Sequence, residues 1–258
     1  MLLQMDPSLA VNYSSASQTA RVITEYWVGN NMFCPRCGCL HIEHFENNKP
    51  VADFYCPSCK NQFELKSKGG VLQGKINDGA YSTMIERITS MNNPDFFFMS
   101  YNKQNWSVQD FFFVPKHFFT PEIIEARKPL ALTARRVGWV GCNILLNRIP
   151  STGRVPIIEK GIVSDRKTVL SKVEKAEKLY VNNMNTRGWL FDVLSCVERI
   201  PTSNFNLAQM YAFEDELSVK HPENNNVRPK IRQQLQLLRD RGFIEFVKPG
   251  EYKKVFFE

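Results

Sequence analysis

The sequence predicts an α/β domain with a mixed central sheet, followed by a smaller helical domain that ends in a β-hairpin. Helical and strand-like patterns alternate through the first two thirds of the chain. Two phenylalanine-rich runs of strand length, Phe96–Tyr101 and Asp110–Val114, suit a buried sheet. The chain of 258 residues is 43% hydrophobic and 23% charged, which excludes a disordered or fibrous protein.

The elements of the first domain follow from local patterns. Apolar residues spaced for one helix face predict the first helix, alternation predicts the strands, and capping residues predict the later helices. In chain order we expect a helix over Ser17–Asn30, short strands over 51–55 and 63–68, a helix capped at Asn77-Asp78-Gly79 and ending near Ser90, the two phenylalanine-rich strands, and a helix opened by Thr120-Pro121-Glu122.

The charge and the termini restrict the class of protein. Lys and Arg outnumber Asp and Glu by 33 to 26, and the resulting net charge of +7 favours a polyanionic partner without identifying it. No signal peptide and no run near the ~18 apolar residues of a membrane helix is evident, so we expect a cytoplasmic protein that does not contact membranes. Seven cysteines, an odd number, in a reducing compartment argue against a disulfide framework.

Four cysteines predict a metal site. Cys34 and Cys37 form one Cys-x2-Cys pair, and Cys56 and Cys59 form a second pair 18 residues further on. This spacing is typical of a closed, tetrahedral, structural zinc site. We therefore predict that Zn²⁺ binds Cys34, Cys37, Cys56 and Cys59; two redox motifs or scattered buried thiols are the alternatives.

Other cysteines and two histidines are weaker candidates as ligands. Cys39 would break the Cys-x2-Cys spacing, and His41 and His44, which lie in the loop between the pairs, are the alternatives that would replace a cysteine. Cys142 and Cys196 stand in apolar surroundings, so we expect them in the core.

Carboxylates flank the second cysteine pair. Asp53 precedes the pair, and Glu64-Leu65-Lys66 follows it on a predicted strand, where alternation places Glu64 and Lys66 on one face. A turn between the two strands would bring Asp53 beside Glu64. Two carboxylates and the carbonyl of Leu65 would bind catalytic Mg²⁺, and Lys66 would position a water and help to deprotonate it for attack on a phosphodiester. The alternative is a solvated charge pair on an exposed strand.

Asp53 with Glu64-Leu65-Lys66 resembles the core motif of the PD-(D/E)xK nucleases, and the chain nearly end to end resembles the DpnI family of methyl-directed restriction endonucleases. The matching segments are Ser17–Thr24, His44–Cys56, Phe63–Lys68, Ile76–Tyr81, Lys128–Asn143, Arg187–Trp189 and Lys230–Asp240.

The resemblance implies a fold and an activity. The fold would be a zinc-containing PD-(D/E)xK endonuclease domain over residues 1–182 and a winged-helix DNA-binding domain over 183–258. The activity would be Mg²⁺-dependent type II cleavage of double-stranded DNA at GATC sites containing N6-methyladenine, as in restriction-modification and defence against phage.

Three residues qualify the resemblance. Ala52, not proline, precedes Asp53. Lys68 shares a strand face with Lys66, so spacing alone assigns the catalytic lysine. Glu25 on the first helix is a candidate for an additional metal ligand, with an ordinary surface charge as the alternative.

A basic stretch lies in the first domain. Between Lys116 and Arg154 seven basic residues face two acidic ones. We expect Arg135 and Arg136 to contact phosphates, and Trp139 to meet a base or methyl group. The alternative, to which we give equal weight, is that Trp139 is a core residue on a buried strand.

The C-terminal part predicts a winged helix. After a polar linker at 181–188, helical patterns at 189–199, 207–220 and 228–241 precede strands at 243–247 and 252–257. In the third helix Ile231, Leu235 and Leu238 form a core stripe. Other positions of that helix carry side chains suited to a DNA major groove; the predicted contacts are Arg228, Lys230, Arg232, Gln233 and Gln234. Winged helices also bind proteins.

The sequence therefore predicts a monomeric endonuclease whose partner is double-stranded DNA with methylated adenine. The alternative is a non-catalytic, zinc-containing, winged-helix DNA-binding regulator in which the carboxylates are solvated.

Overall fold

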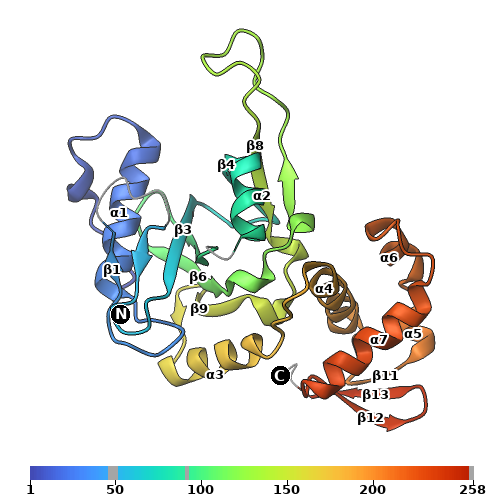
Figure 1. The fold of residues 1–258 in the computed structure, drawn as a ribbon. Helices are drawn as coiled ribbons and strands as arrows, with labels where there is room; N and C mark the ends of the chain where they lie inside the picture. Colours follow the sequence, from blue (N-terminus) through green and yellow to red (C-terminus); the bar gives the residue numbers. More distant parts are fainter. Residues whose placement is uncertain (46–51, 91–92, 256–258) are drawn as a thin grey trace. The chain divides into compact units, whose positions relative to one another are not determined.

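The computed structural model describes residues 1–45, 52–90 and 93–255 (Figure 1). The chain divides into two compact units. Unit 1 comprises Met1–Asn147 and Thr152–Glu177, and unit 2 comprises Arg148–Ser151 and Lys178–Glu258. Among the described residues, no helix has both the length and the apolar character needed to cross a membrane.

Unit 1 contains a mixed sheet of seven strands in the order β1-β2-β3-β5-β6-β9-β10. β3 pairs in parallel with β5, and the other neighbouring strands are antiparallel. The bounds are β1 Glu43–His44, β2 Phe54–Tyr55, β3 Gln62–Gly69, β5 Asp95–Tyr101, β6 Val108–Val114, β9 Val155–Glu159 and β10 Ile162–Val163. This confirms the predicted mixed central sheet and both phenylalanine-rich strands.

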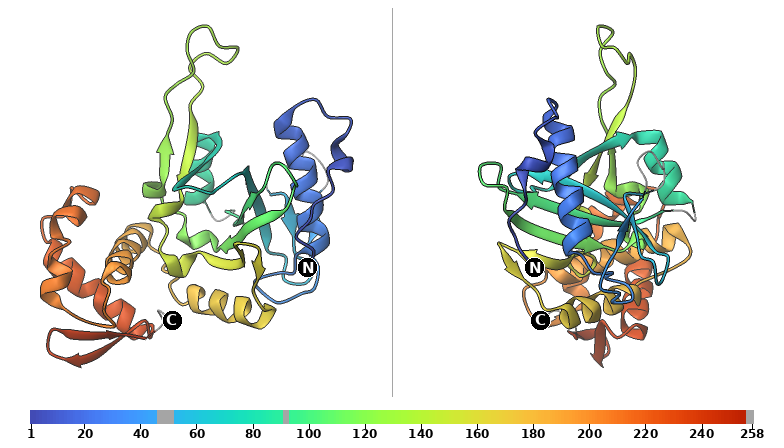
Figure 2. Two further views of the ribbon diagram at one scale, coloured as in Figure 1. Left: turned by 180° about the vertical axis from the view of Figure 1, so that it is seen from behind. Right: turned by 90° about the vertical axis from the view of Figure 1, so that its left-hand side faces the viewer.

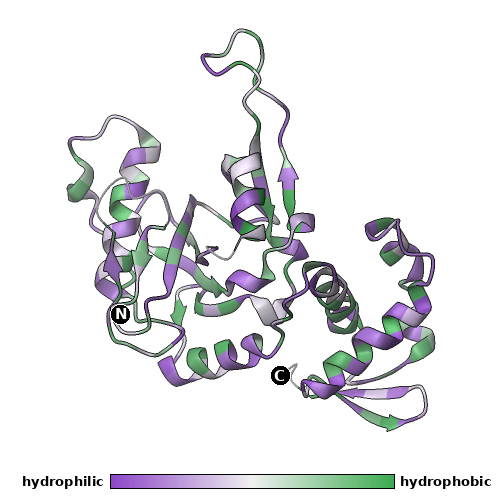
Figure 3. Ribbon diagram, viewed as in Figure 1, coloured by the Kyte–Doolittle hydropathy of each residue, from purple (hydrophilic) through white to green (hydrophobic). Residues whose placement is uncertain are grey.

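Phenylalanine stacking forms the core of this sheet. Every residue of β5 is buried, as expected for a central strand covered on both faces. The ring of Phe97 stacks on Phe63 of β3 at 5.2 Å and on Phe111 of β6 at 5.1 Å. Such offset aromatic pairs add to the hydrophobic gain of burial. Figure 3 shows hydrophobic residues along the central strands and hydrophilic ones on the outer helix faces.

Helices flank the sheet of unit 1 (Figure 2). α1, Ala16–Asn31, packs against β3 and confirms the predicted first helix. α3, Arg166–Glu177, packs against β9 and was not expected from the sequence. Short 3-10 helices lie at Pro7–Ala10, Lys116–Phe118, Pro121–Ile123, Leu146–Arg148 and Ser151–Gly153.

A second, three-stranded sheet in unit 1 corrects two predictions. Its order is β4-β8-β7, with β4 Lys75–Ala80, β8 Gly141–Leu145 and β7 Ile124–Ala126. Asn77-Asp78-Gly79 is therefore strand and not a helix cap, and α2 runs from Tyr81 to Thr89. Thr120 and Pro121 open one 3-10 turn instead of an α-helix. β4, which contains Asn77 and Asp78, pairs with β8, and so does β7, which directly follows the 3-10 turn. Local sequence patterns do not reveal this partner.

Residues 127–140, here called the β7–β8 loop, connect the last two strands of this sheet. The loop extends away from the rest of unit 1 (Figure 1). Its base is closed by hydrogen bonds from Arg127 N to the Gly141 carbonyl, 2.9 Å, and from Leu130 N to the Trp139 carbonyl, 3.0 Å.

Unit 2 is a winged helix. A three-stranded antiparallel sheet in the order β11-β13-β12 accompanies the helices. The bounds are α4 Met184–Arg199, β11 Asn204–Asn206, α5 Leu207–Tyr211, α6 Glu214–Lys220, α7 Val227–Asp240, β12 Ile244–Lys248 and β13 Glu251–Lys254. α4, α5 and α6 all pack against α7, whose Ile231, Leu235 and Leu238 are fully buried as predicted.

Several details of unit 2 differ from the sequence prediction. The expected linker at 181–188 is partly helix, because Asn183 caps α4 and the guanidinium of Arg187 donates to the Val181 carbonyl at 2.9 Å. The expected helix at 207–220 breaks at Ala212 and Phe213 into α5 and α6. β11 was not predicted. Phe256 and Phe257, expected in the last strand, lie outside the described residues.

Candidate active site and metal centre

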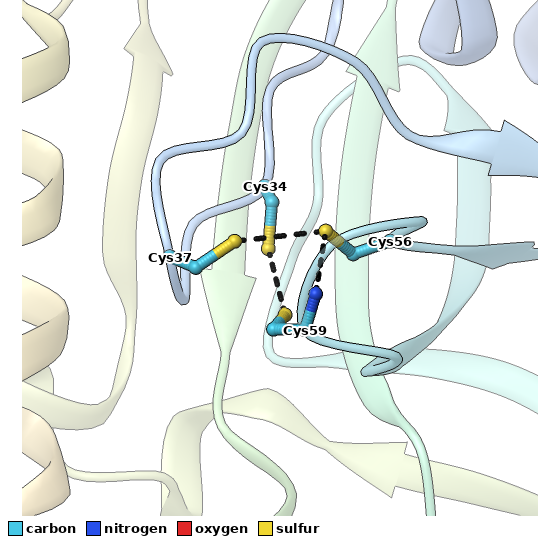
Figure 4. A group of neighbouring side chains, drawn as sticks. All are labelled: Cys34, Cys37, Cys56 and Cys59. Atoms are coloured by element: carbon cyan, nitrogen blue, oxygen red, sulfur yellow. Dashed lines mark hydrogen bonds between the residues drawn. The ribbon is translucent and has the colours of Figure 1, made fainter.

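The four predicted zinc ligands come together. The Sγ atoms of Cys34, Cys37, Cys56 and Cys59 all lie within 4.8 Å of one another. Two sulfur pairs, Cys34 with Cys59 and Cys37 with Cys56, are 3.6 Å apart (Figure 4). Tetrahedral Zn–S bonds of about 2.3 Å need sulfurs about 3.8 Å apart, so the cluster fits a zinc ion. Within the described part of the chain, neither Cys39, His41 nor His44 belongs to it.

Both cysteine pairs have the same backbone turn. In the first, Gly38 N donates to the Cys34 carbonyl at 2.9 Å; in the second, Lys60 N donates to the Cys56 carbonyl at 2.9 Å. Gly38 has φ 75° and Lys60 has φ 62°. Glycine adopts this left-handed conformation without cost, whereas Lys60 adopts it against its preference. Formation of the sulfur cluster compensates for this strain in the second turn.

The second cysteine turn connects β2 to β3 and sets the register of the carboxylates. Phe54 pairs with Phe63, so Asp53 and Glu64 are the next opposed residues. Asp53 N donates to the Phe63 carbonyl at 3.0 Å, and Leu65 N donates to Asp53 Oδ2 at 2.7 Å. The expected proximity of Asp53 and Glu64 is thus present.

Next to Asp53, four charged side chains are linked by successive ion pairs in which acidic and basic groups alternate. Lys66 Nζ lies 2.5 Å from Glu64 Oε1 and also forms an ion pair with Asp78 Oδ1. Arg87 Nη2 lies 2.7 Å from Glu64 Oε2. The side chains of Asp78, Glu64 and Lys66 are only 10%, 11% and 17% exposed, and Arg87 is 25% exposed. We call Asp78–Lys66–Glu64–Arg87 the charge chain.

Asp78 and Arg87 were not among the predicted site residues. Asp78 was interpreted as part of a helix cap, because Asn-Asp-Gly is a common local turn signal. The alternation of buried Ile76 with exposed Asn77 would have indicated a strand instead.

Negative charge is in excess around Asp53. Burial raises the pKa of Asp53, the Leu65 N–H lowers it, and the Glu64 and Glu25 carboxylates raise it further, to about 6 overall. Glu25 of α1 itself pairs with Arg21 at 2.6 Å and with His44 Nε2 at 2.9 Å. Excess negative charge on oxygen ligands suits a hard divalent cation such as Mg²⁺.

Lys66 stays protonated in this setting. Burial opposes the charge, but the carboxylates of Glu64 and Asp78 outweigh burial and raise the pKa of Lys66 well above its usual value. An ammonium can orient a water but has no lone pair with which to accept its proton. This arrangement suits the expected role of Lys66 in positioning a water, and its expected help in deprotonating that water stays a prediction. Lys68, the other lysine on this strand face, is exposed.

Comparison with known families agrees with this geometry. The model of the family described as DpnI, the Dam-replacing family, matches residues 1–182. A second model, the Dam-replacing HTH domain, matches residues 185–254. The chain belongs to the DpnI family. Membership implies a methyl-directed restriction endonuclease that binds DNA, and it confirms the resemblance seen in the sequence.

The β7–β8 loop presents the predicted DNA-contacting residues of the nuclease part of this DpnI-family chain. Arg135 and Arg136 are exposed, and Trp139 is half-buried against Gly141. Leu132 of the same loop is 87% exposed. The Trp139 side chain is therefore only partly buried. Its ring packs at the base of the loop, and the arginines of the loop face solvent.

The predicted DNA contacts on α7 differ in their exposure to solvent. Arg228, Arg232 and Gln233 are exposed and Lys230 is half-buried. Gln234 is fully buried, so the prediction that it contacts DNA is wrong. It lies three residues after Ile231 and four before Leu238, which places it on the core face of the helix. Gln236 is exposed and lies four residues after Arg232, so it occupies the outer face of the helix where Gln234 was expected.

Some outer side chains of α7 are held by neighbours. Arg232 Nη1 donates to the Tyr211 hydroxyl at 2.6 Å, and Arg228 pairs with Glu214 at 2.7 Å while its guanidinium lies over the Tyr211 ring. Tyr211 of α5 therefore orients two arginines at the surface of α7.

We expect Cys56→Ser to reduce bound zinc from one ion per chain to well below one and to lower the melting temperature, because the cluster loses a thiolate. Metal analysis and thermal unfolding measure the two effects. Cys39→Ser is the matched control and should keep its zinc. Equal zinc content in Cys56→Ser and Cys39→Ser would contradict the assignment.

Asp53→Asn should stabilise the zinc-loaded protein in the absence of Mg²⁺, and more so at higher pH. Because the folded pKa of about 6 exceeds the usual 3.8, wild-type stability falls as pH rises through this range. The advantage of the variant in urea unfolding should grow from about half its final size at pH 5 to as much as about 3 kcal/mol at pH 7.5.

Addition of Mg²⁺ provides the control for this experiment. Mg²⁺ should raise the stability of the wild type and not that of Asp53→Asn, because only the native carboxylate binds it. An advantage of the variant that does not change with pH would contradict the assigned pKa.

Gln233→Ala and Gln234→Leu form a matched pair on α7. Gln233→Ala should weaken binding of a methylated duplex by about 1–3 kcal/mol, because one base-edge contact is lost. Gln234→Leu should leave the Kd unchanged, since this side chain is buried and its Oε1 has no hydrogen-bond partner within the described residues. Fluorescence anisotropy with a labelled duplex measures both, and the reverse order would contradict the assignment.

Proposed function

We propose that the chain is a Mg²⁺-dependent type II endonuclease that cuts double-stranded DNA at GATC sites containing N6-methyladenine. The nuclease domain would span residues 1–182 and the winged-helix DNA-binding domain residues 183–258. The observation that carries the proposal is that the β2–β3 pair brings Asp53 beside the Glu64-Leu65-Lys66 segment. Leu65 N donates to Asp53 Oδ2 at 2.7 Å, and Glu64 lies 2.5 Å from Lys66. Membership of a methyl-directed family supports the substrate class.

Asp53, Glu64 and the Leu65 carbonyl would hold the catalytic Mg²⁺. All three supply oxygen atoms, the ligand type that Mg²⁺ prefers; Glu64 and Leu65 lie on β3, and Asp53 directly precedes β2. When bound, Mg²⁺ supplies a water of lowered pKa and neutralises charge on the scissile phosphate. The four cysteines would hold a structural Zn²⁺ that keeps the turn between β2 and β3 closed.

Lys66 would orient the attacking water and the phosphate. Its ammonium can donate up to three hydrogen bonds, of which two point to Glu64 and Asp78. The remaining N–H would be directed at the water or at a phosphate oxygen. Lys66 would also help to deprotonate this water, whose proton would leave to solvent or to a phosphate oxygen.

Both units would contribute to DNA binding. In unit 1 the exposed Arg135 and Arg136 would contact phosphates beside Trp139, and in unit 2 the outer face of α7 would enter the major groove. Apolar contact with one methyl group contributes only about 1 kcal/mol, so we propose that both units read the methylated adenine. The protein would act as a monomer in the cytoplasm and cut the two strands in turn.

The regulator alternative is less well supported. In a non-catalytic DNA-binding protein the carboxylates would be solvated, whereas Glu64 is only 8% exposed and forms ion pairs with Lys66 and Arg87. A soluble fold does not need such a buried charge cluster, because well-packed apolar residues stabilise at least as well.

Incubation of adenine-methylated and unmethylated plasmid with protein and Mg²⁺ tests the function. We expect cleavage at GATC of the methylated plasmid alone. Lys66→Ala should lower the rate by about 10²–10⁴-fold with zinc content and DNA affinity retained. Lys68→Ala, its neighbour on the same strand, should lose less than tenfold. Binding of methylated plasmid without cleavage would favour the regulator.

A further inference from the structure

Lys66 has two carboxylate partners, and only one of them belongs to the proposed metal site. Glu64 Oε1 lies 2.5 Å from Lys66 Nζ, and Glu64 would also bind Mg²⁺. Asp78 contacts the same ammonium from β4, a strand of the other sheet of unit 1.

Asp78 is held in place by the strand that carries it. It pairs with Cys142 of β8, its Oδ1 accepts from Gly79 N at 2.7 Å, and its side chain is 10% exposed. Cys142 itself is fully buried. A short side chain on a paired strand has few alternative positions, so the carboxylate is fixed before any ligand arrives.

A bound cation makes this second partner necessary. Mg²⁺ and the Lys66 ammonium carry charge of the same sign, and both would share the Glu64 carboxylate. Like charges at such short range in a poorly solvated site repel strongly, so the flexible lysine side chain would swing away unless another anion lay on its far side. Asp78 is that anion.

We propose that Asp78 is a positioning residue that holds the ammonium of Lys66 at the active site when Glu64 binds Mg²⁺. The inference rests on the nuclease function proposed above and deepens it. The prediction is a loss of turnover with no loss of substrate or metal binding, because Asp78 would touch neither.

The experiment compares Asp78→Asn, Asp78→Glu and the wild type on a methylated GATC duplex. Single-turnover rates at saturating enzyme, the Kd for the duplex without Mg²⁺, and the Mg²⁺ concentration for half-maximal rate are measured for each. Glu125→Gln is the matched control, since Glu125 lies on β7 of the same sheet and its carboxylate contacts Lys75 at 3.0 Å and Asn143 Nδ2 at 2.6 Å.

Asp78→Asn should cut more slowly by about 100-fold, the scale of effect when a catalytic group is misplaced by about 1 Å. Its Kd and its Mg²⁺ requirement should stay within twofold of the wild type. Asp78→Glu restores the negative charge on a side chain one methylene longer, so it should cut at least tenfold faster than Asp78→Asn. Glu125→Gln should cut at the wild-type rate within twofold.

Three results would overturn the proposal. A rate for Asp78→Asn within threefold of the wild type would show that Lys66 needs no second anchor. A tenfold higher Mg²⁺ requirement, with the rate restored at high Mg²⁺, would make Asp78 a metal ligand. Loss of DNA affinity and zinc in both Asp78 variants would assign the residue to folding.

The remaining outcomes also support or overturn the proposal. If only Asp78→Asn fails to fold, Asp78→Glu is decisive: a reduced rate with normal binding supports the proposal, and a wild-type rate overturns it. A wild-type protein that binds methylated duplex without cutting it refutes the nuclease function itself, which is a different failure.

Discussion

The candidate active site depends on the pairing of β2 with β3 across the second cysteine turn. β2 has only two residues, and a pair of strands this short is not stable alone in water. The cysteine cluster closes its turn, and β5 supports β3 on the other side through a parallel ladder from Phe63 to Gly69. Asp53 and Glu64 therefore face each other because of a metal-binding turn and a phenylalanine core, and not because of their own interactions.

The sequence predicted what is encoded by spacing or by continuous pattern. The cysteine pairs, the Asp53 and Glu64 register, the phenylalanine strands and the core stripe of α7 all depend on residues close together in the chain. The prediction failed where a distant partner decides the structure. Asp78 is a strand residue because it pairs with Cys142, 64 positions later, and this pairing overrides its local turn signal. Gln234 shows a different limit, since its type suggested DNA while its helix position placed it in the core.

Charge balance explains how the site folds without a cation. Lys66 and Arg87 compensate Glu64 and Asp78 along the charge chain, whereas the pKa of Asp53 is raised to about 6, chiefly by burial and further by the Glu64 and Glu25 carboxylates. If Mg²⁺ binds as proposed, Glu64 would exchange ion-pair partners for the cation. The site would then also need Lys66 to stay in place, and Asp78 on β4 of the second sheet would hold it there.

The closeness of the four sulfurs also has a consequence for redox chemistry. Cys34 with Cys59 and Cys37 with Cys56 are the near pairs, and each joins one cysteine turn to the other. Burial raises the pKa of Cys37, but the Cys39 N–H and the neighbouring thiols lower it overall to about 7. If Zn²⁺ is bound as proposed, its bonds to the four sulfurs would keep them from being oxidised by O₂ to two disulfides that join one turn to the other.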